Sequence, residues 1–527
     1  GLQPDSPQRL KAGIYYALEQ AADEGHCHLN QATLAQRARA LLGIGDELDL
    51  EPHLESLISE NFIVRELEML SLTQLYRAER FVAQFTAQRI AAEPHPIIEE
   101  QIIERCVAQA AQDLGLEFSP EQLRAVQYAT HHPFLIITGG PGCGKTTLIR
   151  ALSAVYDRAN RRVLLAAPTG RAAQRMSQVC GMPAGTIHRL LRYDPHKHKF
   201  LHDSHNPLPG DVLIIDEASM LDINLARDLF AAIPGNCVLI LVGDKDQLPS
   251  VGPGRVFADL LAVREVKSVA LSHLFRRSEE SSINSVAHMI NSGITPEIPA
   301  PDGNTKTDAY FLPKTSADEA ANLIESLVAD QLPRKFGFEL DDITVLTPSN
   351  RGPLGTNELN KRLQKRLNPE NNALTQNQIM HGETCFRVGD RVCQRVNNYN
   401  LHEAGVFNGD NGIIYRVDPQ NRKLLVELWD GRLIEYESGD ISQLSLAYAV
   451  SVHRSQGSEI PCVVLALHES QYNLLERQLL YTGVTRAKKL LVVVGSKRAL
   501  NIASRRTSSK QRCTYLRERI KEYLSNA

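Results

Sequence analysis

The sequence predicts an α/β protein with two domains built on parallel sheets, a small β-barrel inserted into the second, and a helical N-terminal domain. Short apolar runs that end in polar or glycine-rich loops recur at 134–138, 212–215, 343–346 and 462–467. Such runs are typical of strands that are buried on both faces of a parallel sheet. Residues 387–444 change to short alternating segments separated by Asn-Gly and Asp-Gly turns, which favours a barrel.

Length and composition set the scale and the class of the protein. At 527 residues the chain is long enough for three or more domains of roughly 150 residues each. A formal net charge of −3 gives no overall sign of nucleic-acid binding, so any DNA-binding surface must be local. Nine scattered cysteines without a C-x-x-C pair argue against disulfides and structural zinc, and for a reducing cytoplasmic location.

Two further expectations come from the hydropathy and the first residue. No apolar run reaches the ~20 residues that a membrane helix needs, so no membrane partner is expected. The chain starts at Gly1 without an initiator Met, and we expect a fragment or a processed form.

The segment from Gly139 to Thr146 fits the phosphate-binding pattern G-x-x-x-x-G-K-[ST]. It follows a predicted strand and opens a predicted helix, which is the context that the pattern requires. Its glycines let backbone N–H groups face phosphate oxygens, Lys145 supplies a positive charge, and the Thr146 hydroxyl suits Mg²⁺. A glycine turn without a ligand is the alternative. The predicted nucleotide contacts are Gly140, Gly142, Gly144, Lys145, Thr146 and Thr147.

Two more strands end in loops with chemically useful side chains. Asp216 and Glu217 follow the run 212–215 in a Walker B arrangement, where the aspartate holds Mg²⁺ and the glutamate polarises the attacking water. Gln247 follows the run 237–242 and is a candidate sensor of the γ-phosphate. Because ligands of α/β sheets bind at the carboxyl ends of strands, we expect these side chains near the phosphate loop.

Cys143 lies inside the phosphate loop, near the N-terminus of the predicted helix. That position is expected to lower the pKa of the thiol and to make it reactive. The alternative is a small buried side chain that faces away from the nucleotide.

Gln122 and a histidine-rich segment carry weaker signals. The Gln122 amide is one predicted helix ahead of the phosphate loop and can pair with adenine, although a plain solvated helix position is the alternative.

Residues 193–210 are too polar for a core element and contain His196, His198, His202 and His205. They lack cysteines or paired carboxylates at metal-ligand spacing, so we expect a projecting excursion and no metal site.

The N-terminal region has the pattern of a winged-helix-like domain. Helices are predicted near 7–21, 31–42 and 51–60, and a short strand at 62–65. Such a unit either binds DNA or only packs and recruits partners, and both interpretations stay open.

Together these motifs resemble those of the superfamily 1B DNA helicases, specifically the RecD-like branch. The resemblance covers essentially the whole chain and rests on the Gln122 region, the phosphate loop, Asp216-Glu217, GDKDQLP (243–249), FRR (275–277), VHRSQGSE (452–459) and YTGVTRA (481–487). It implies two RecA-like P-loop NTPase domains, an SH3-like barrel and a β-hairpin pin at 193–210. It also implies ATP- and Mg²⁺-dependent movement, 5′ to 3′, along single-stranded DNA and unwinding at junctions with duplex.

The resemblance also implies roles for individual residues. ATP on the first RecA-like domain would meet Arg276 and Arg486 of the second, which stabilise charge on the transferring phosphoryl group. Gly457 is an implied nucleotide contact. The implied DNA contacts are Pro168, Thr169, His188, Arg351, Asn397, Asn398, Tyr399, His453 and Arg454. For Arg351 and the loop 397–399, ordinary polar surface is the alternative.

By this resemblance, the sequence divides into an N-terminal domain, a linker helix, two RecA-like domains, a barrel and a C-terminal helix. The implied division runs as an N-terminal domain at 1–95, a linker helix at 96–117, the first RecA-like domain at 118–275, the second at 276–386 and 445–500, the barrel at 387–444 and a basic C-terminal helix at 501–527. We expect a monomer whose N-terminal domain contacts other DNA repair or replication proteins. Two other functions stay open: a translocase or recombination-complex subunit that does not unwind alone, and a P-loop kinase, against which the paired arginines argue.

Overall fold

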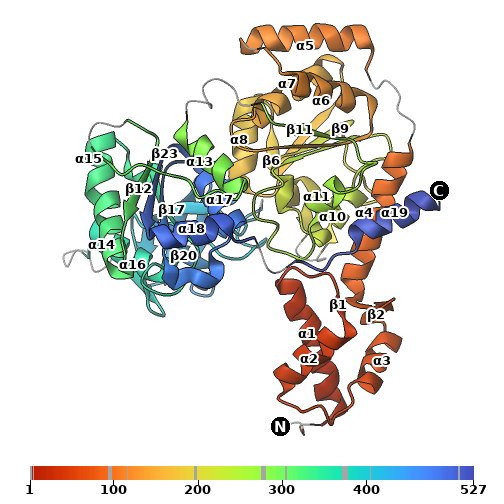
Figure 1. Cartoon of the computed structure of the whole chain (residues 1–527), viewed down its shortest axis with the longest axis horizontal. Helices are drawn as coiled ribbons and strands as arrows, with labels where there is room; N and C mark the ends of the chain where they lie inside the picture. The colour runs from red at the N-terminus through yellow and green to blue at the C-terminus, as the bar shows by residue number, and fades with distance from the viewer. Residues whose placement is uncertain are drawn as a thin grey trace.

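The computed structural model describes residues 3, 5–92, 98–115, 117–194, 199–273, 281–302, 306–370, 378–403, 405–507 and 511–526. Two α/β domains lie side by side, and a helical N-terminal lobe extends from the first of them (Figure 1). Arg276, one of the two predicted arginines at the nucleotide, lies outside the described residues.

The first α/β domain contains a six-stranded parallel sheet. Its strand order is β11-β4-β10-β9-β5-β6. The strands are β4 (Phe134–Gly139), β5 (Val163–Ala167), β6 (Ala184–Thr186), β9 (Val212–Ile215), β10 (Val238–Gly243) and β11 (Ser268–Leu271). The helices are α6 (Pro120–His131), α7 (Lys145–Arg158), α8 (Gly170–Cys180), α9 (Ile187–Leu191), α10 (Ile223–Ala231) and α11 (Val256–Leu261). Because β4, β10 and β9 are neighbours, the phosphate loop and the loops that carry Gln247 and Asp216 emerge side by side.

Alternating side chains of the central strand fill two cores. Phe134 and Ile136 of β4 belong to one buried cluster, and Leu135 and Ile137 belong to another on the opposite face. Successive strand side chains point to opposite faces, so a continuous apolar run indicates a sheet that is covered on both sides. The predicted double-sided burial is confirmed here.

The second α/β domain has a five-stranded parallel sheet in the order β12-β23-β22-β13-β21. Its strands are β12 (Ala309–Pro313), β13 (Ile343–Thr347), β21 (Ala449–Ser451), β22 (Ile460–Leu467) and β23 (Ala487–Gly495). Its helices are α13 (Ser282–Asn291), α14 (Ala317–Ser326), α15 (Leu332–Phe336), α16 (Thr356–Leu367), α17 (Arg477–Thr485) and α18 (Lys497–Arg505). Most of the motif at 481–487 lies in α17, and Arg486 directly follows this helix.

An antiparallel sheet in the order β19-β18-β17-β16-β20 forms the inserted barrel. Its strands are β16 (Arg391–Gln394), β17 (Asn411–Asp418), β18 (Lys423–Leu428), β19 (Leu433–Tyr436) and β20 (Leu444–Leu446), with a hairpin of β14 (Gln378–His381) and β15 (Thr384–Arg387) beside it. Leu446 pairs with Val392, so the last barrel strand extends beyond the expected end at 444.

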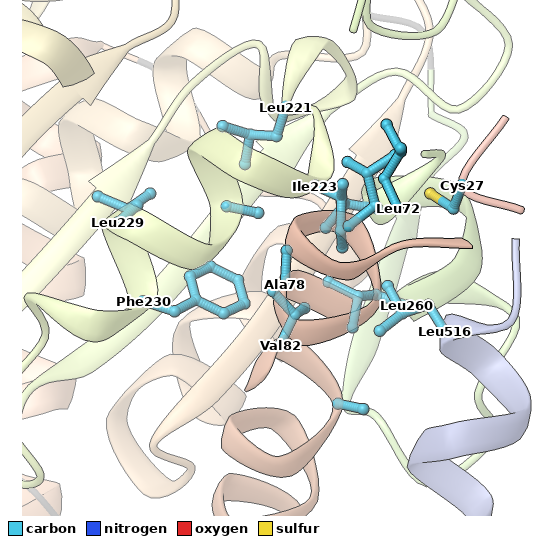
Figure 2. Close-up of a cluster of buried hydrophobic side chains, with 14 of the residues drawn as sticks. Cys27, Leu72, Ala78, Val82, Leu221, Ile223, Leu229, Phe230, Leu260 and Leu516 are labelled. Carbon is cyan, nitrogen blue, oxygen red and sulfur yellow. The ribbon is translucent and has the colours of Figure 1, made fainter. Parts of the chain in front are cut away.

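The N-terminal lobe combines helices with a small sheet. It contains α1 (Pro7–Asp23), β1 (Leu29–Asn30), α2 (Gln31–Leu42), α3 (Glu51–Ser59), β2 (Ile63–Glu66) and β3 (Met69–Leu72), and the sheet order is β1-β3-β2. The helix α4 (Thr73–Ala91) leads from this lobe onto the first α/β domain, where Phe85 packs on Phe230 with ring centroids 4.7 Å apart. Figure 2 shows Ala78 and Val82 of α4 beside Leu229 and Phe230 of α10.

The C-terminal helix α19 (Leu516–Ser525) also packs on α4 (Figures 1 and 2). The basic helix expected at 501–527 is not continuous, because α18 ends at Arg505 and α19 begins at Leu516. Within α19, Arg519 is buried and pairs with Glu66 at 2.6 Å and with Glu79 at 3.5 Å. The segment before it holds a loop of the first domain, since Arg512 donates to the carbonyl oxygens of Ser250 at 2.6 Å and Gly254 at 2.8 Å.

The predicted linker helix is part of the first α/β domain, and the predicted pin is shorter than expected. The helix α5 (Glu100–Leu114) packs on α7 of the first domain and places Ile103 and Cys106 in its core. In the pin region, β7 (Tyr193–Asp194) pairs antiparallel with β8 (Lys199–Phe200). Leu208, expected to project with residues 193–210, is only 2% exposed and belongs to a core, so the projecting part is shorter.

The described residues contain neither a membrane-spanning helix nor a cluster of metal-ligand side chains. Among these residues, no helix has the length and apolar character needed to cross a membrane. Within the same residues, no three His, Cys, Asp or Glu side chains gather as metal ligands. His196 and His198 lie outside the described residues.

Candidate functional site

The phosphate loop joins β4 to α7 and is shaped by two glycines. Gly142 and Gly144 have φ values of 77° and 76°, a left-handed backbone that residues with a Cβ rarely adopt. The turn sets the N-terminus of α7, with its positive dipole end, beside the end of β4. The Lys145 ammonium group donates to the carbonyl oxygens of Gly139 and Gly140 at 2.6 and 2.9 Å, so it lies across the loop.

The thiol inside this loop is not activated, and the expectation of a lowered pKa is wrong. Cys143 is buried, and burial raises the pKa of its thiol more than the nearby Lys145 ammonium group lowers it. The sulfur is 3.9 Å from the carbonyl oxygen of Pro141. Desolvation of the thiolate therefore outweighs the helix N-terminus and the lysine.

We expect Cys143 to react slowly with iodoacetamide in the native protein and quickly after unfolding. Only the thiolate attacks, so a raised pKa and a covered sulfur both slow alkylation. The partly exposed Cys385 and Cys513 are the internal controls. Peptide mapping by mass spectrometry after timed alkylation gives the order of labelling. Early, ATP-protected labelling of Cys143 would instead support the activated thiol expected from the sequence.

Asp216 is buried and Glu217 is half-buried, and together they form an acidic pair at the end of β9. The Glu217 N–H donates to Asp216 Oδ1 at 2.8 Å, and Glu217 has a φ of 53°, which is unusual for a residue other than glycine. Burial and the neighbouring Glu217 carboxylate raise the pKa of Asp216 to about 6. Burial and a nearby like charge both disfavour the ionised carboxyl group. With the Thr146 hydroxyl, Asp216 supplies hard oxygen donors, so the residues present fit a nucleotide-bound Mg²⁺.

Arg486 reaches this acidic pair from the second domain. Its Nη1 lies 3.9 Å from Glu217 Oε1, and its side chain is only 3% exposed. The guanidinium group also donates to the carbonyl oxygens of Thr482 at 3.3 Å and Ser458 at 3.2 Å. These contacts hold one arginine of the second domain against the acidic pair of the first.

The loop after β10 is also held by the second domain. Tyr481 Oη donates to Asp244 Oδ2 at 2.8 Å, and the Thr482 hydroxyl accepts from Leu248 N–H at 2.9 Å. Gln456 Nε2 donates to the carbonyl oxygen of Leu248 at 2.8 Å. Asn291 of α13 also donates to Asp246 Oδ2 at 2.8 Å, so three segments of the second domain hold the loop that contains Gln247.

Gln247 itself lies inside this contact. Its Nε2 donates to Asp244 Oδ2 at 3.3 Å, and its side chain is buried. The Asp244 carboxylate thus joins Gln247 and Tyr481 in one hydrogen-bonded group. Burial raises the pKa of Asp244, against a smaller opposing effect of Lys145.

Arg175 of α8 links the predicted Mg²⁺ ligand to the second domain. Its Nη2 donates to Thr146 Oγ1 at 3.0 Å and lies 2.6 Å from Glu459 Oε1. Lys488 approaches the other oxygen of Glu459 at 3.5 Å. A guanidinium group therefore stands at the Thr146 hydroxyl and bridges the two domains.

Gln122 lies beside the phosphate loop, and its side chain also caps α6. Its Oε1 accepts from Ser119 N–H at 3.0 Å in a capping box, and its Nε2 is 3.5 Å from the Gly144 carbonyl oxygen. The amide oxygen keeps a second lone pair and the amide nitrogen a second N–H, so the cap is compatible with a bidentate contact with adenine.

Two residues assigned to different ligands meet across the domain interface. A Cβ built on Gly457, a predicted nucleotide contact, would lie 2.6 Å from Oγ1 of Thr169, a predicted DNA contact. Gly457 also has a φ of 70°, so this position needs glycine for both reasons. The Thr169 hydroxyl caps α8 by accepting from Ala172 N–H at 3.3 Å, and Pro168 precedes it at the end of β5.

Three of the predicted DNA contacts lie on loops of the second domain. Arg351 and His453 are exposed, on the loop after β13 and in a short helical turn. Arg454 Nη1 donates to Ser445 Oγ at 3.2 Å. Arg454 also lines a small cavity between the two α/β domains and the barrel, together with Arg171 and Arg391. Asp341 also lines this cavity and pairs with Arg391 at 2.8 Å.

Comparison with known protein families supports this architecture. Residues 122–253 match an AAA domain, and residues 446–494 match the UvrD-like helicase C-terminal domain. Residues 359–428 match the SH3 domain of ATP-dependent RecD-like DNA helicases. The ATP-dependent RecD2 DNA helicase of Deinococcus radiodurans is 33% identical over 98% of this chain and 70% of its own length.

The chain belongs to the RecD-like helicase family. The RecD subunits of the RecBCD enzymes of Mycolicibacterium smegmatis and Mycobacterium tuberculosis are 30% and 32% identical, over 76% and 73% of this chain and 75% and 70% of their own lengths. The protein is an ATP-dependent DNA helicase with two RecA-like domains and an SH3-like domain.

In this helicase the remaining predicted DNA contacts lie where the barrel meets the pin. The His188 ring is 6.3 Å from the Tyr399 ring. The amide of Asn398 donates to Gln443 Oε1 at 3.0 Å, and Asn397 Oδ1 accepts from Asn408 N–H at 2.9 Å. Both asparagines thus shape the barrel loop.

Several residues of the helicase site were missed by sequence reasoning. Tyr481, Gln456 and Glu459 stand inside motifs that were recognised, but only a glycine, a histidine and arginines of those motifs were selected. Asp244 is the second residue of the recognised motif at 243–249, from which only Gln247 was selected. Arg175 lies within α8 and had no motif signal, because its contact with Thr146 arises from packing of α8 beside α7.

Proposed function

We propose that this helicase moves 5′ to 3′ along single-stranded DNA and separates duplex strands at a junction, with the pin as the wedge. The observation that supports ATP-driven movement is the approach of Arg486 to Glu217, at 3.9 Å, across the interface of the two RecA-like domains, and the polarity and the wedge are those that the resemblance to superfamily 1B helicases implies. An arginine of one domain that contacts the acidic pair of the other makes hydrolysis depend on how the domains meet. Domain closure and ATP turnover would therefore be coupled.

The proposed roles follow from the positions of the side chains. Lys145 and the loop N–H groups would hold the phosphates, and Thr146 and Asp216 would hold Mg²⁺, which supplies charge neutralisation on the phosphates when bound. Glu217 would orient the attacking water. Arg175 would have to leave the Thr146 hydroxyl when Mg²⁺ binds there, which would release its bridge to Glu459.

Replacing Arg486 with alanine or lysine is expected to slow ATP hydrolysis by roughly 10²–10³-fold and to leave ATP binding nearly intact, because its charge acts mainly on the transition state. Single-turnover hydrolysis and equilibrium binding of a labelled nucleotide separate the two effects. The control is Arg498→Ala, an exposed arginine on α18. Loss of nucleotide affinity with normal maximal turnover would show a structural role for Arg486 instead.

Strand displacement on duplexes with a 5′ or a 3′ single-stranded tail tests the proposed polarity. The proposal requires ATP-dependent unwinding of the 5′-tailed duplex and little of the 3′-tailed one. Preferential unwinding of the 3′-tailed duplex would reverse the polarity.

A second candidate is a motor subunit that moves on DNA but does not unwind alone. The RecD relatives that are subunits of RecBCD enzymes favour it. The same assay decides, because such a subunit would hydrolyse ATP with single-stranded DNA and leave both tailed duplexes intact.

A further inference from the structure

Five rings meet where the pin touches the barrel, and we call them the pin–barrel clasp: His188, Tyr193, Phe200, Tyr399 and Phe407. Tyr193 and Tyr399 have ring centroids 3.9 Å apart with an interplanar angle of 32°. His188 lies 5.4 Å from Phe407 and 5.8 Å from Phe200. These distances are those of directly packed aromatic pairs.

The clasp joins parts of the chain that belong to different domains. Tyr193 and Phe200 are opposite each other at the base of the pin hairpin. Tyr399 and Phe407 directly follow Asn398 and Val406, which pair across the barrel loop. The contact therefore connects the first RecA-like domain to the barrel inserted in the second.

On the barrel side the rings stand on a well-bonded loop. Phe407 is 9% exposed, and its N–H donates to Asp410 Oδ2 at 2.8 Å. Asn398 accepts from Asn400 N–H at 2.9 Å next to Tyr399. These hydrogen bonds hold the loop backbone that carries Tyr399 and Phe407.

The clasp is also uncharged. Burial lowers the pKa of His188 to about 4, so its ring is neutral at neutral pH. Burial raises the pKa of Tyr399 to about 12, with a smaller contribution from Tyr193. Neutral, partly buried rings favour apolar packing between the two surfaces.

The pin hairpin needs such support. The strands β7 and β8 have two residues each. A two-stranded hairpin is marginally stable by itself in water, and a wedge that yields cannot split base pairs. The clasp rings come from the pin, from α9 beside it and from the barrel loop.

We infer that the pin–barrel clasp braces the pin, so that Tyr193, Phe200 and Phe407 are positioning residues for strand separation. This inference rests on the proposed function of the pin as a wedge. It predicts that loosening the clasp uncouples unwinding from ATP hydrolysis, because the RecA-like domains still hydrolyse ATP while the unsupported pin is displaced by the duplex.

The test compares Phe407→Ala and Tyr193→Ala with Tyr415→Ala, a control on the outer surface of the same barrel that is 62% exposed. We expect the two clasp variants to lose roughly tenfold or more in unwinding rate on a 5′-tailed duplex, with ATPase stimulation and affinity for single-stranded DNA retained. Tyr193→Phe keeps the ring and is expected to unwind normally. Thermal unfolding checks each variant, and Tyr193→Ala decides if Phe407→Ala fails to fold.

Three outcomes would overturn the inference. Normal unwinding by Tyr193→Ala would show that the brace is not needed. A parallel loss of affinity for single-stranded DNA would identify the rings as a stacking surface for bases. An equal defect in Tyr193→Phe would implicate the hydroxyl group and not ring packing. The proposed function fails separately, if the helicase without its pin still unwinds DNA.

Discussion

Replacing Lys145 with alanine is expected to lower DNA-stimulated ATP hydrolysis by on the order of 10²–10³-fold or more, because the ammonium group is the positive charge that the phosphate loop itself brings to the phosphates. The lysine ammonium group lies across the phosphate loop, bonded to the carbonyl oxygens of Gly139 and Gly140. A nucleotide would offer it phosphate oxygens in place of these neutral acceptors. An alanine leaves the fold of the loop to Gly142 and Gly144 but removes the charge.

The measurement is steady-state ATPase activity with saturating single-stranded DNA, together with the thermal unfolding temperature. The matched control is Lys267→Ala, an exposed lysine of the same domain ahead of β11. We expect the control to be unchanged in both measurements. Turnover by Lys145→Ala close to that of the control would contradict the assignment of the phosphate loop.

The second large effect is expected from removing the pin. Exchanging residues 193–200 for a short Gly-Ser turn should abolish duplex unwinding and leave DNA-stimulated ATPase activity intact. The Leu201 N–H donates to the Arg192 carbonyl oxygen at 2.9 Å, so these two residues can close the shortened turn. The exchange must stop before Leu208, because that side chain is buried in the core of the first domain. Opening a base-pair step costs about 1.4 kcal/mol of stacking on average, which a braced wedge has to supply.

Two assays on the same preparation read out this prediction, ATPase activity with single-stranded DNA and strand displacement on a 5′-tailed duplex. A variant with Leu201→Ala, an exposed side chain after β8, serves as the control for local disturbance. Retained unwinding in the pinless protein would mean that the segment is only a surface loop. Loss of both activities would mean that it supports the fold or the grip on DNA.

The parts of the fold that follow from local patterns could be predicted from the sequence. The apolar run 212–215 is β9 without change, because a strand buried on both faces leaves a continuous apolar signature. The phosphate loop could also be predicted from the sequence, because its glycines are required by the local backbone conformation and not by contacts with distant segments. The arrangement of β4, β10 and β9 then places Asp216 and Gln247 beside it.

Contacts between distant segments could not be predicted in this way. The Gln122 amide serves a helix cap, which depends on Ser119, and the Cys143 pKa depends on how much protein covers the sulfur. Leu208 looks like one residue of a polar excursion until its neighbours from other elements are known. The clasp rings were read singly, as a histidine and a tyrosine that contact DNA, because nothing local indicates that they meet.

The packing of α19 on α4 has a consequence for biosynthesis. Glu79 of α4 and Arg519 of α19 are 440 residues apart in sequence. A growing chain emerges from the ribosome N-terminus first, so α4 is made long before the helix that covers it. Until then the apolar surface that receives Leu516 and Ile520 is uncovered, and an exposed apolar patch on a nascent chain can attract chaperones and other unfinished chains. The helix α19 therefore covers a surface of α4 that is synthesised 440 residues earlier.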